Sequence, residues 1–297
     1  MLSVTMAGLN AAQKEMNVTS NNLANASTVG FKRSYANFGD VFSSDPAANP
    51  KTTVGAGVLT SSISRDMSAG ALKTTGRATD MAMDGRGFFI TSNPDSTDGA
   101  YTYSRAGNFG LDSDGYVVDP GGYAVMAYPT SSGADYTSTD TTYPTASYSS
   151  LTALQIPATY SSGDVIPDAE NLNKTALTSD VVLQGISISS KGEVQATYSD
   201  NNTYTMGFVA VANFANEGGL KPIGGNRYSS TGISGDPVTT VAGSPDAGNI
   251  MSGALEQANV DITNELMDMI RAQQVYNGNA RMLQTTVETV SRITDKL

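Results

Sequence analysis

The chain has 297 residues and a formal net charge of −11, and it contains no Cys, His or Trp. These absences exclude a disulfide framework, a zinc site built from Cys or His, and a Cys or Ser-His nucleophile. No apolar run approaches the roughly 20 residues of a membrane span, so we expect no membrane insertion. We also expect no cleaved secretory signal, because Lys14 and Glu15 fall where its apolar region would lie.

The negative charge is concentrated in the middle of the chain. Residues 78–250 hold 6 Lys and Arg against 18 Asp and Glu, whereas residues 1–77 hold 7 against 4 and residues 251–297 hold 4 against 6. This distribution is typical of packed termini and a solvated outer domain. Nucleic acid is not an expected partner, because binding to phosphates needs a basic face.

The first residues predict an amphipathic helix. Apolar and small residues recur at alternating steps of three and four, which is the spacing of a coiled-coil seam. The seam consists of Leu2, Thr5, Leu9, Ala12, Met16, Thr19 and Leu23. We expect the helix to end near Ala26, because Asn and Ser residues in this stretch compete for helical hydrogen bonds. Gly30 can adopt the left-handed conformation that often follows a helix.

Residues 31–72 carry few regular signals, and we expect an extended linker or arm there. Within it, residues 43–57 are rich in Pro, Gly, Ala and Thr and have few apolar anchors. Such a segment can either flex or act as an ordered strut.

Residues 73–254 predict an antiparallel β domain. Short aromatic and apolar runs alternate with dipeptides that favour hairpin turns, namely Asp84-Gly85, Asp98-Gly99, Asp114-Gly115 and Gly121-Gly122. Residues 129–182 are rich in Ser, Thr and Tyr, and we expect a loop or surface excursion there.

Candidate chemistry is sparse. Asp112, Asp114 and Asp119 loosely resemble a calcium loop, but the glycine and the bidentate Glu of that loop are missing from their positions, so a hairpin turn is the better interpretation. Gly85-x-Gly87 precedes a strand rather than a helix, which excludes a phosphate loop. The carboxylate pair of a glycosidase is not excluded by sequence, but no pair stands out. We predict no enzyme, no catalytic residues, no cofactor and no metal.

The C-terminal stretch, residues 259–297, predicts the longest helix, with Asp261 as its N-cap. Its seam also alternates steps of four and three, and we predict that it pairs with the N-terminal seam. The C-terminal seam consists of Ile262, Leu266, Met269, Gln273, Tyr276, Ala280, Leu283, Val287, Val290, Thr294 and Leu297.

Further apolar residues lie off this seam, and a helix that is apolar on more than one face is buried on more than one face. An ordinary helical bundle would explain them, but the chain offers no other long amphipathic helix to cover them. We therefore predict that they contact other copies of the protein. They are Met267, Ile270, Val275, Met282 and Ile293.

The predicted fold class is α+β. Paired coiled-coil helices at residues 1–30 and 255–297 enclose the linker at 31–72 and an antiparallel outer domain at 73–254, which contains the excursion at 129–182.

Three stretches resemble signatures of the bacterial flagellar axial proteins, which include rod, hook and hook-associated proteins. The first is SNNLAN at 20–25 with TVGFK at 28–32, whose signature residues are Asn21, Asn22, Asn25, Gly30 and Phe31. The second is GRGFF at 85–89 with YSRAGNF at 103–109. The third is GALEQANVD at 253–261 with EL at 265–266 and MIRAQ at 269–273.

Two further stretches are similar to the hook pattern within this family, FKRS with FGDVF at 31–42 and VANFANEGGL at 211–220. The resemblance is therefore closest to the flagellar hook protein. Hook proteins usually insert a second outer domain where this chain has only residues 129–182. This departure keeps a distal rod protein open as the alternative.

The resemblance implies a structural subunit that self-assembles into a helical tube, transmits torque and passes exported subunits through a central channel. It implies neighbouring axial proteins, the hook-assembly cap and the export apparatus as partners. It also implies an extracellular location in the flagellum, reached without a cleaved signal peptide. A secreted adhesin or binding module is the alternative from another class.

Overall fold

The computed structural model describes residues 2–41, 55, 57–93, 100–129, 151–162 and 179–294. The chain forms two compact units, which we describe separately. Unit 1 contains Met1–Ser27, Lys32–Ser68 and Ala258–Leu297, and unit 2 contains Thr28–Phe31 and Ala69–Gln257. Almost all of the segment at 43–57 and most of the excursion at 129–182 lie outside the described residues.

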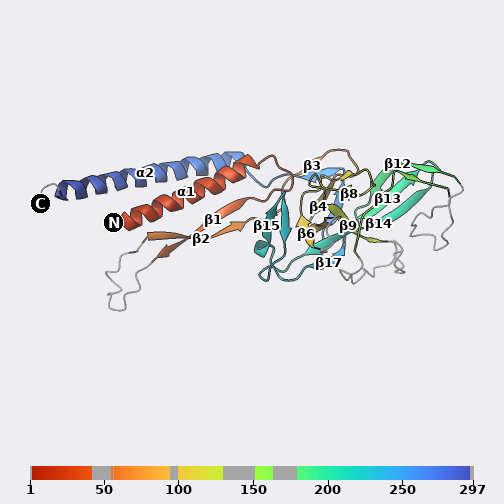
Figure 1. Cartoon of the computed structure of the whole chain (residues 1–297), viewed down its shortest axis with the longest axis horizontal. Helices are drawn as coiled ribbons and strands as arrows, with labels where there is room; N and C mark the ends of the chain where they lie inside the picture. The colour runs from red at the N-terminus through yellow and green to blue at the C-terminus, as the bar shows by residue number, and fades with distance from the viewer. Residues whose placement is uncertain are drawn as a thin grey trace. The chain divides into compact units, whose positions relative to one another are not determined.

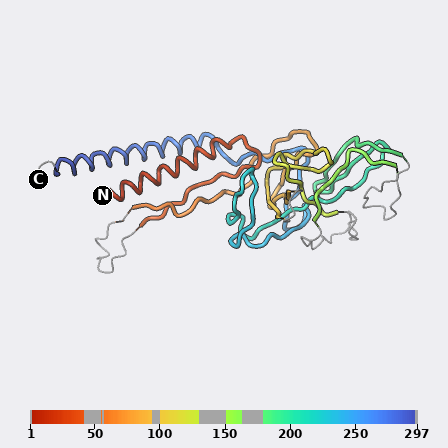
Figure 2. The backbone as a smooth tube through the Cα atoms, in the orientation of Figure 1, coloured from red at the N-terminus to blue at the C-terminus, as the bar shows by residue number. Residues whose placement is uncertain are grey.

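Unit 1 is built from the two terminal helices and one hairpin. Helix α1 (Leu2–Ala24) and helix α2 (Ile262–Thr294) run antiparallel, so that both chain ends lie at the same end of this unit (Figures 1 and 2). Strands β1 (Ser34–Val41) and β2 (Gly57–Arg65) form an antiparallel hairpin with one register shift after Asn37. Helix α1 contacts both α2 and this hairpin.

The hairpin lies where the sequence analysis expected a separate linker. Residues 32–68 belong to the same compact unit as the helices, and the division at residues 31 and 72 does not match the observed units. The sequence pattern did not reveal this hairpin, because neither strand shows a strict alternation of buried and exposed residues. The two strands form because they pair with each other through their backbones.

The ends of the helices follow local signals. Asp261 caps α2 as expected, because its side-chain carboxylate accepts the backbone N–H groups of Thr263 at 2.9 Å and Asn264 at 3.3 Å. Helix α1 ends at Ala24, and the side-chain amide of Asn25 donates to the carbonyl oxygen of Asn21 at 2.9 Å.

Unit 2 is an antiparallel β structure around one large sheet. The main path of this sheet has the order β11-β12-β13-β14-β9-β5-β6-β16-β15, with β10, β17, β7 and β8 attached to it. Its strands are β5 (Phe88–Ser92), β6 (Tyr101–Ser104), β7 (Gly110–Leu111), β8 (Val117–Val118), β9 (Ala124–Pro129), β10 (Thr152–Ala153), β11 (Thr159–Tyr160), β12 (Val181–Ile188), β13 (Glu193–Tyr198), β14 (Thr203–Asn213), β15 (Lys221–Gly224), β16 (Arg227–Ser229) and β17 (Val238–Val241).

Two small antiparallel pairs complete unit 2. Strand β4 (Met81–Asp84) pairs with β18 (Asn249–Ser252), and β3 (Leu72–Thr74) pairs with β19 (Ala254–Glu256). A short 3₁₀ helix, η2 (Glu217–Gly219), precedes β15. The predicted α+β class, with an antiparallel domain between terminal helices, therefore describes the chain.

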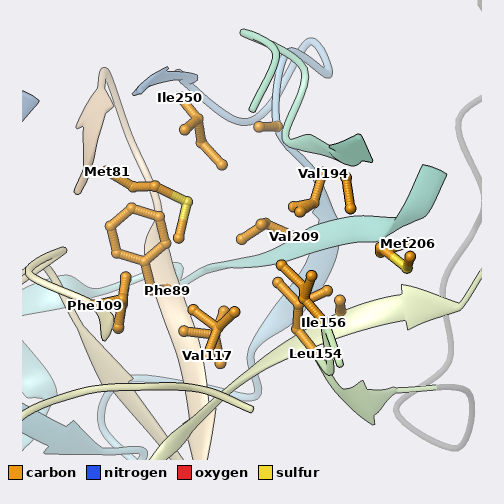
Figure 3. Close-up of a cluster of buried hydrophobic side chains, with 14 of the residues drawn as sticks. Met81, Phe89, Phe109, Val117, Leu154, Ile156, Val194, Met206, Val209 and Ile250 are labelled. Carbon is orange, nitrogen blue, oxygen red and sulfur yellow. The ribbon is translucent and has the colours of Figure 1, made fainter. Parts of the chain in front are cut away.

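The hydrophobic core of unit 2 gathers side chains from many strands (Figure 3). Phe89 and Phe109 meet edge to face with ring centroids 5.4 Å apart, beside Met81 and Val117. Burying one such side chain stabilises a fold by about 1.5–3 kcal/mol. Val209 and Val211, on the long strand β14, are fully buried at the centre of the unit.

The turn dipeptides behave differently from one another. Asp114-Gly115 lies between the paired strands β7 and β8, and Gly121-Gly122 lies between the paired strands β8 and β9, as predicted. Asp84-Gly85 stands at the end of β4, whose partner is the distant strand β18 rather than β5. Asp98-Gly99 lies outside the described residues.

We predict that Gly107→Ala strongly destabilises unit 2. An added methyl group at Gly107 would overlap the backbone carbonyl oxygen of Met81, whose N–H donates to the Gly107 carbonyl at 2.9 Å. We expect a loss of about 3 kcal/mol or more in the free energy of unfolding, measured with urea by circular dichroism. Gly110→Ala is the control, because nothing lies within 4 Å of its added methyl group. Equal stability of the two variants would contradict the prediction.

Candidate functional site

The two terminal helices meet in a defined register. Asn22 of α1 bonds to Glu265 of α2, and a methyl group added at Gly8 would lie 2.8 Å from the side-chain nitrogen of Asn279. In two antiparallel helices, the numbers of facing residues add up to a constant as long as the register does not change. Both pairs add up to 287, so α1 and α2 keep one register along their contact. Gly8 therefore allows a close approach of the helices, a role that the sequence analysis did not assign to it.

The α1 residues of the predicted seam lie mostly on the inner side of the helix. Thr5, Ala12 and Thr19 are buried, and Leu9, Met16 and Leu23 are half-buried, whereas Leu2 is exposed.

On α2 the structure brings in a different set of residues. Met269, Tyr276 and Leu283 are half-buried, but Ile262, Leu266, Val287 and Val290 are exposed. Beside Met269, Tyr276 and Leu283, a second row of α2 residues is buried or half-buried. It consists of Glu265, Ala272, Asn279 and Thr286. These residues are seven apart, and together with Met269, Tyr276 and Leu283 they complete a four-three spacing. They are polar or small, so an apolar pattern could not reveal them. Knobs-into-holes packing of the two helices stays a prediction.

A group of buried and half-buried polar side chains, which we call the polar junction, joins α1, α2 and the hairpin of unit 1. It consists of Asn22, Lys32, Arg33, Asn259 and Glu265. The Asn22 amide donates to the Ser34 carbonyl at 2.7 Å and to the Glu265 carboxylate at 3.1 Å, and its oxygen accepts the Ser34 N–H at 2.9 Å. Asn22 and Glu265 are each only 1% exposed. One amide thus joins both helices to the start of β1.

Charged side chains complete the polar junction. Arg33 pairs with Glu265 and, at 3.6 Å, with Asp268. The buried Lys32 ammonium donates to the Ser68 carbonyl at 2.6 Å. Asn259 accepts the Arg33 N–H at 2.7 Å and donates to the Asp66 carbonyl at 2.9 Å. Burying a carboxylate as deeply as that of Glu265 is costly unless hydrogen-bond donors and a positive charge such as these surround it.

Glu15 on α1 adds pH sensitivity beside this junction. Desolvation and the nearby Asp268 raise the pKa of Glu15, against the opposing effect of Arg271. A raised carboxyl pKa means that the folded form binds a proton more readily than the unfolded form. Acidification through this pKa therefore removes a repulsion and favours pairing of α1 with α2.

Signature residues Gly30 and Phe31 belong to unit 2, whereas Asn21, Asn22 and Asn25 belong to unit 1. Gly30 has a φ of 68°, and its N–H donates to the Glu256 carbonyl at 2.8 Å. A methyl group added at Gly30 would lie 2.5 Å from the backbone nitrogen of Ala106. Both its conformation and its close packing therefore require glycine.

A buried ion pair in unit 2 was not foreseen. Arg105 lies 3.6 Å from Glu256, donates to the Gly85 carbonyl at 2.9 Å, and stacks over the Phe88 ring. Burial lowers the pKa of Arg105, while Glu256 raises it. Both residues stand in the recognised motifs, but their pairing across half of the chain leaves no local signal.

The apolar residues predicted off the seam are all exposed in the single chain. Met267, Ile270, Val275, Met282 and Ile293 are between 49% and 58% exposed. Other exposed apolar side chains of unit 1 include Ile262, Leu266, Val287 and Val290 on α2 and Tyr35, Phe38, Val41, Leu59 and Ile63 on the hairpin. Exposed apolar side chains in such numbers indicate an interaction site.

The described residues offer little for other chemistry. They contain no group of three or more Asp, Glu, Cys or His side chains placed to hold a metal ion. Asp112 and Asp119 instead bond to the backbone of their own turns. Among the described helices, none has both the length and the hydropathy that a membrane span requires.

Comparison with known proteins identifies the family. Three family models match, described as flagella basal body rod protein (residues 2–32), flagellar hook protein FlgE/F/G D1 domain (82–196) and flagellar basal body rod FlgEFG protein C-terminal (251–295). The flagellar basal-body rod protein FlgG of Agrobacterium fabrum is 31% identical over 100% of this chain and 98% of its own. The chain belongs to the flagellar rod and hook protein family.

Other members of the rod and hook family align over nearly the whole chain. The Bacillus subtilis FlgG is 28% identical over 97% of this chain and 95% of its own, and the Escherichia coli hook protein FlgE is 25% identical over 95% and 96%. The two terminal family models include four of the five residues of the polar junction, all except Arg33, together with the exposed apolar residues Met267, Ile270, Val275, Met282 and Ile293 of α2. This membership makes the chain a structural axial component of the flagellum and not an enzyme.

Proposed function

We propose that the chain is a rod or hook subunit that polymerises into a helical tube through α1 and α2. The observation that carries this proposal is the exposed apolar surface along α2, with Met267, Ile270, Val275, Met282 and Ile293 as the interface residues. Burial of these side chains between copies would remove a large apolar area from water and drive assembly.

The function of such a tube is mechanical. Terminal helices packed between copies would form its wall, and the acidic β unit would form the outer layer. We propose the coiled-coil pairing of Leu2, Leu9, Met16 and Leu23 with Met269, Tyr276 and Leu283 as the basis of that wall, and we propose that Ile262, Leu266, Val287 and Val290 join it on assembly. The tube would transmit torque and allow exported chains to pass.

The remaining partners follow from this role. We propose neighbouring axial proteins, the hook-assembly cap and the export apparatus as partners, together with export without a cleaved signal peptide. In the hook, the location would be extracellular. We propose no binding to nucleic acid and no membrane insertion.

Length favours the rod over the hook. Matches to the rod protein FlgG run over about the length of this chain, 309 and 299 positions for the two species above. The match to the hook protein runs over 399 positions, so the hook protein carries segments that this chain of 297 residues lacks. The hook, which the sequence motifs favour, is the second candidate, supported by the 25% identity to the E. coli protein.

Negative-stain electron microscopy of the purified chain tests both levels of the proposal. Tubes are the expected result, whereas discrete particles at every concentration would contradict assembly and favour an adhesin or binding module. Straight, rigid tubes would identify a rod, and curved or flexible tubes would identify a hook.

We predict that both chain ends are open to proteases before assembly. The described residues of the segments 1–30 and 255–297 expose apolar side chains in the free chain, and the inward face of α1 includes Thr5, Ala12 and Thr19, which bury little apolar area. Limited proteolysis should remove both ends of the free chain rapidly and leave them intact in tubes. Equal resistance in the two states would show that the helices are already stable in the monomer.

A further inference from the structure

A groove runs between α1 and α2 on one side of unit 1. Its walls are Gln13, Met16, Asn17 and Ser20 on α1, and Met269, Gln273 and Tyr276 on α2, and its volume is about 330 Å³. On α1 these residues lie at positions i, i+3, i+4 and i+7, and on α2 at i, i+4 and i+7. Each set follows one side of its helix for two turns, so the groove runs along the helix axes. This is the shape of a receptor for a third helix.

The chemistry of the groove restricts what fills it. None of the seven lining side chains is charged. Two are methionines, whose flexible thioethers adapt to the shape of an inserted group. The other five are polar but uncharged, namely Gln13, Asn17, Ser20, Gln273 and Tyr276. A charged helix would lose hydration here without gaining a charged partner, so an uncharged helix face is the matching ligand.

The same chain carries a matching face. Val275, Met282 and Ile293 are spaced by 7 and 11 residues, and at about 100° per residue these spacings place them on one line along α2. All three are exposed. Among the described residues, α1 and α2 are the only helices longer than one turn, and the exposed large hydrophobics of α1 are confined to its first residues.

Gly278 lies between Val275 and Met282 in an exposed part of α2. Glycine inside a helix is less favourable than alanine by about 1 kcal/mol. A methyl group added at Gly278 would meet nothing within 4 Å, so packing within the described chain does not require this glycine. A neighbouring backbone or side chain that approaches α2 closely at this point would require it.

We propose that the groove between α1 and α2 receives α2 of a second copy, which inserts Val275 and Met282 with Gly278 between them. This inference rests on the proposed self-assembly and names its two contact surfaces. Gln273 on the groove wall and Met282 are nine residues apart, which places them about 180° apart around the helix. Groove and inserted face therefore lie on opposite sides of α2. Such a contact is heterologous, and it continues from copy to copy as an open helix.

Disulfide trapping tests the contact, because the natural chain has no Cys. Full-length Asn17→Cys is mixed with full-length Val275→Cys or Met282→Cys under assembly conditions and treated with a mild oxidant. We expect a disulfide-linked heterodimer from at least one mixture, since the two Cα atoms must come within about 7 Å. Gln284→Cys is the matched control, because it is exposed, two residues from Met282, and on the other side of α2.

Each result has a defined meaning. The proposed contact is supported if tubes form, Asn17→Cys cross-links to Val275→Cys or Met282→Cys, and Asn17→Cys does not cross-link to the Gln284→Cys control. Tubes that form without this cross-link contradict the proposed groove contact but not the proposed self-assembly. If the natural chain forms no tubes, both proposals are wrong. If the cysteine variants themselves do not assemble, Asn17→Trp decides. By filling the groove it should raise the critical concentration for assembly at least tenfold, whereas Asn21→Trp, which is outside the groove, should not. An unchanged value for Asn17→Trp overturns the proposal.

Discussion

Met282→Asp should abolish tube formation while leaving unit 2 folded. The side chain is 58% exposed in the single chain, so the substitution places a carboxylate in water and does not strain the monomer. In the assembled state the same carboxylate would be buried without a partner, which costs several kcal/mol at each contact. Because every subunit repeats the contact, the penalty applies to each addition to the tube.

Sedimentation measures the loss of assembly, and circular dichroism of the β unit checks that the fold survives. Gln284→Asp is the control, since it adds the same charge and the same change of helix propensity on the other side of α2. We expect this control to form normal tubes. Normal tubes from Met282→Asp would show that the Met282 side of α2 faces solvent or the channel.

The sequence predicted the parts of the fold that depend on neighbouring residues. The spacing of apolar residues placed both terminal helices, Asp261 marked the start of α2, and turn dipeptides such as Asp114-Gly115 marked hairpins of the β unit. Each of these signals acts within a few residues of itself. Family motifs then identified the flagellar axial proteins, which the matches to rod and hook proteins confirm.

The contact face of α2 was harder to predict, because polar and small residues form half of it. A search for apolar spacing chose Leu266 and Val287, which are exposed, over Glu265 and Ala272, which are buried. Burial of Glu265 is possible because Asn22 donates a hydrogen bond to it and Arg33 forms an ion pair with it, and Asn22 lies 243 residues away in the sequence. No local pattern contains that information. A short strand at 58–63 was compatible with the sequence, but β1 and its pairing with β2 were not predicted. The two strands are stabilised by each other and by α1 rather than by an alternation of their own residues.

Asn22→Asp should weaken assembly through the polar junction. The two side chains have nearly the same size, but a carboxylate cannot donate to the Ser34 carbonyl or to Glu265 as the Asn22 amide does. It would also place a second negative charge beside Glu265 at a site that is 1% exposed. A buried donor lost and a like charge added together cost about 3 kcal/mol. This is about a hundredfold in an equilibrium constant.

The critical concentration for tube formation is the measurement, because the junction must close in the assembled subunit. We expect it to rise about a hundredfold at neutral pH and to recover as the pH falls. The direction follows from proton binding: burial beside Glu265 raises the pKa of the introduced carboxyl, so the folded form takes up a proton more readily, and the protonated group donates again. Asn21→Asp is the matched control, one residue away on the exposed side of α1. If both variants assemble like the natural chain, the Asn22 bonds do not hold the helices in register, and the apolar contacts alone would have to do so.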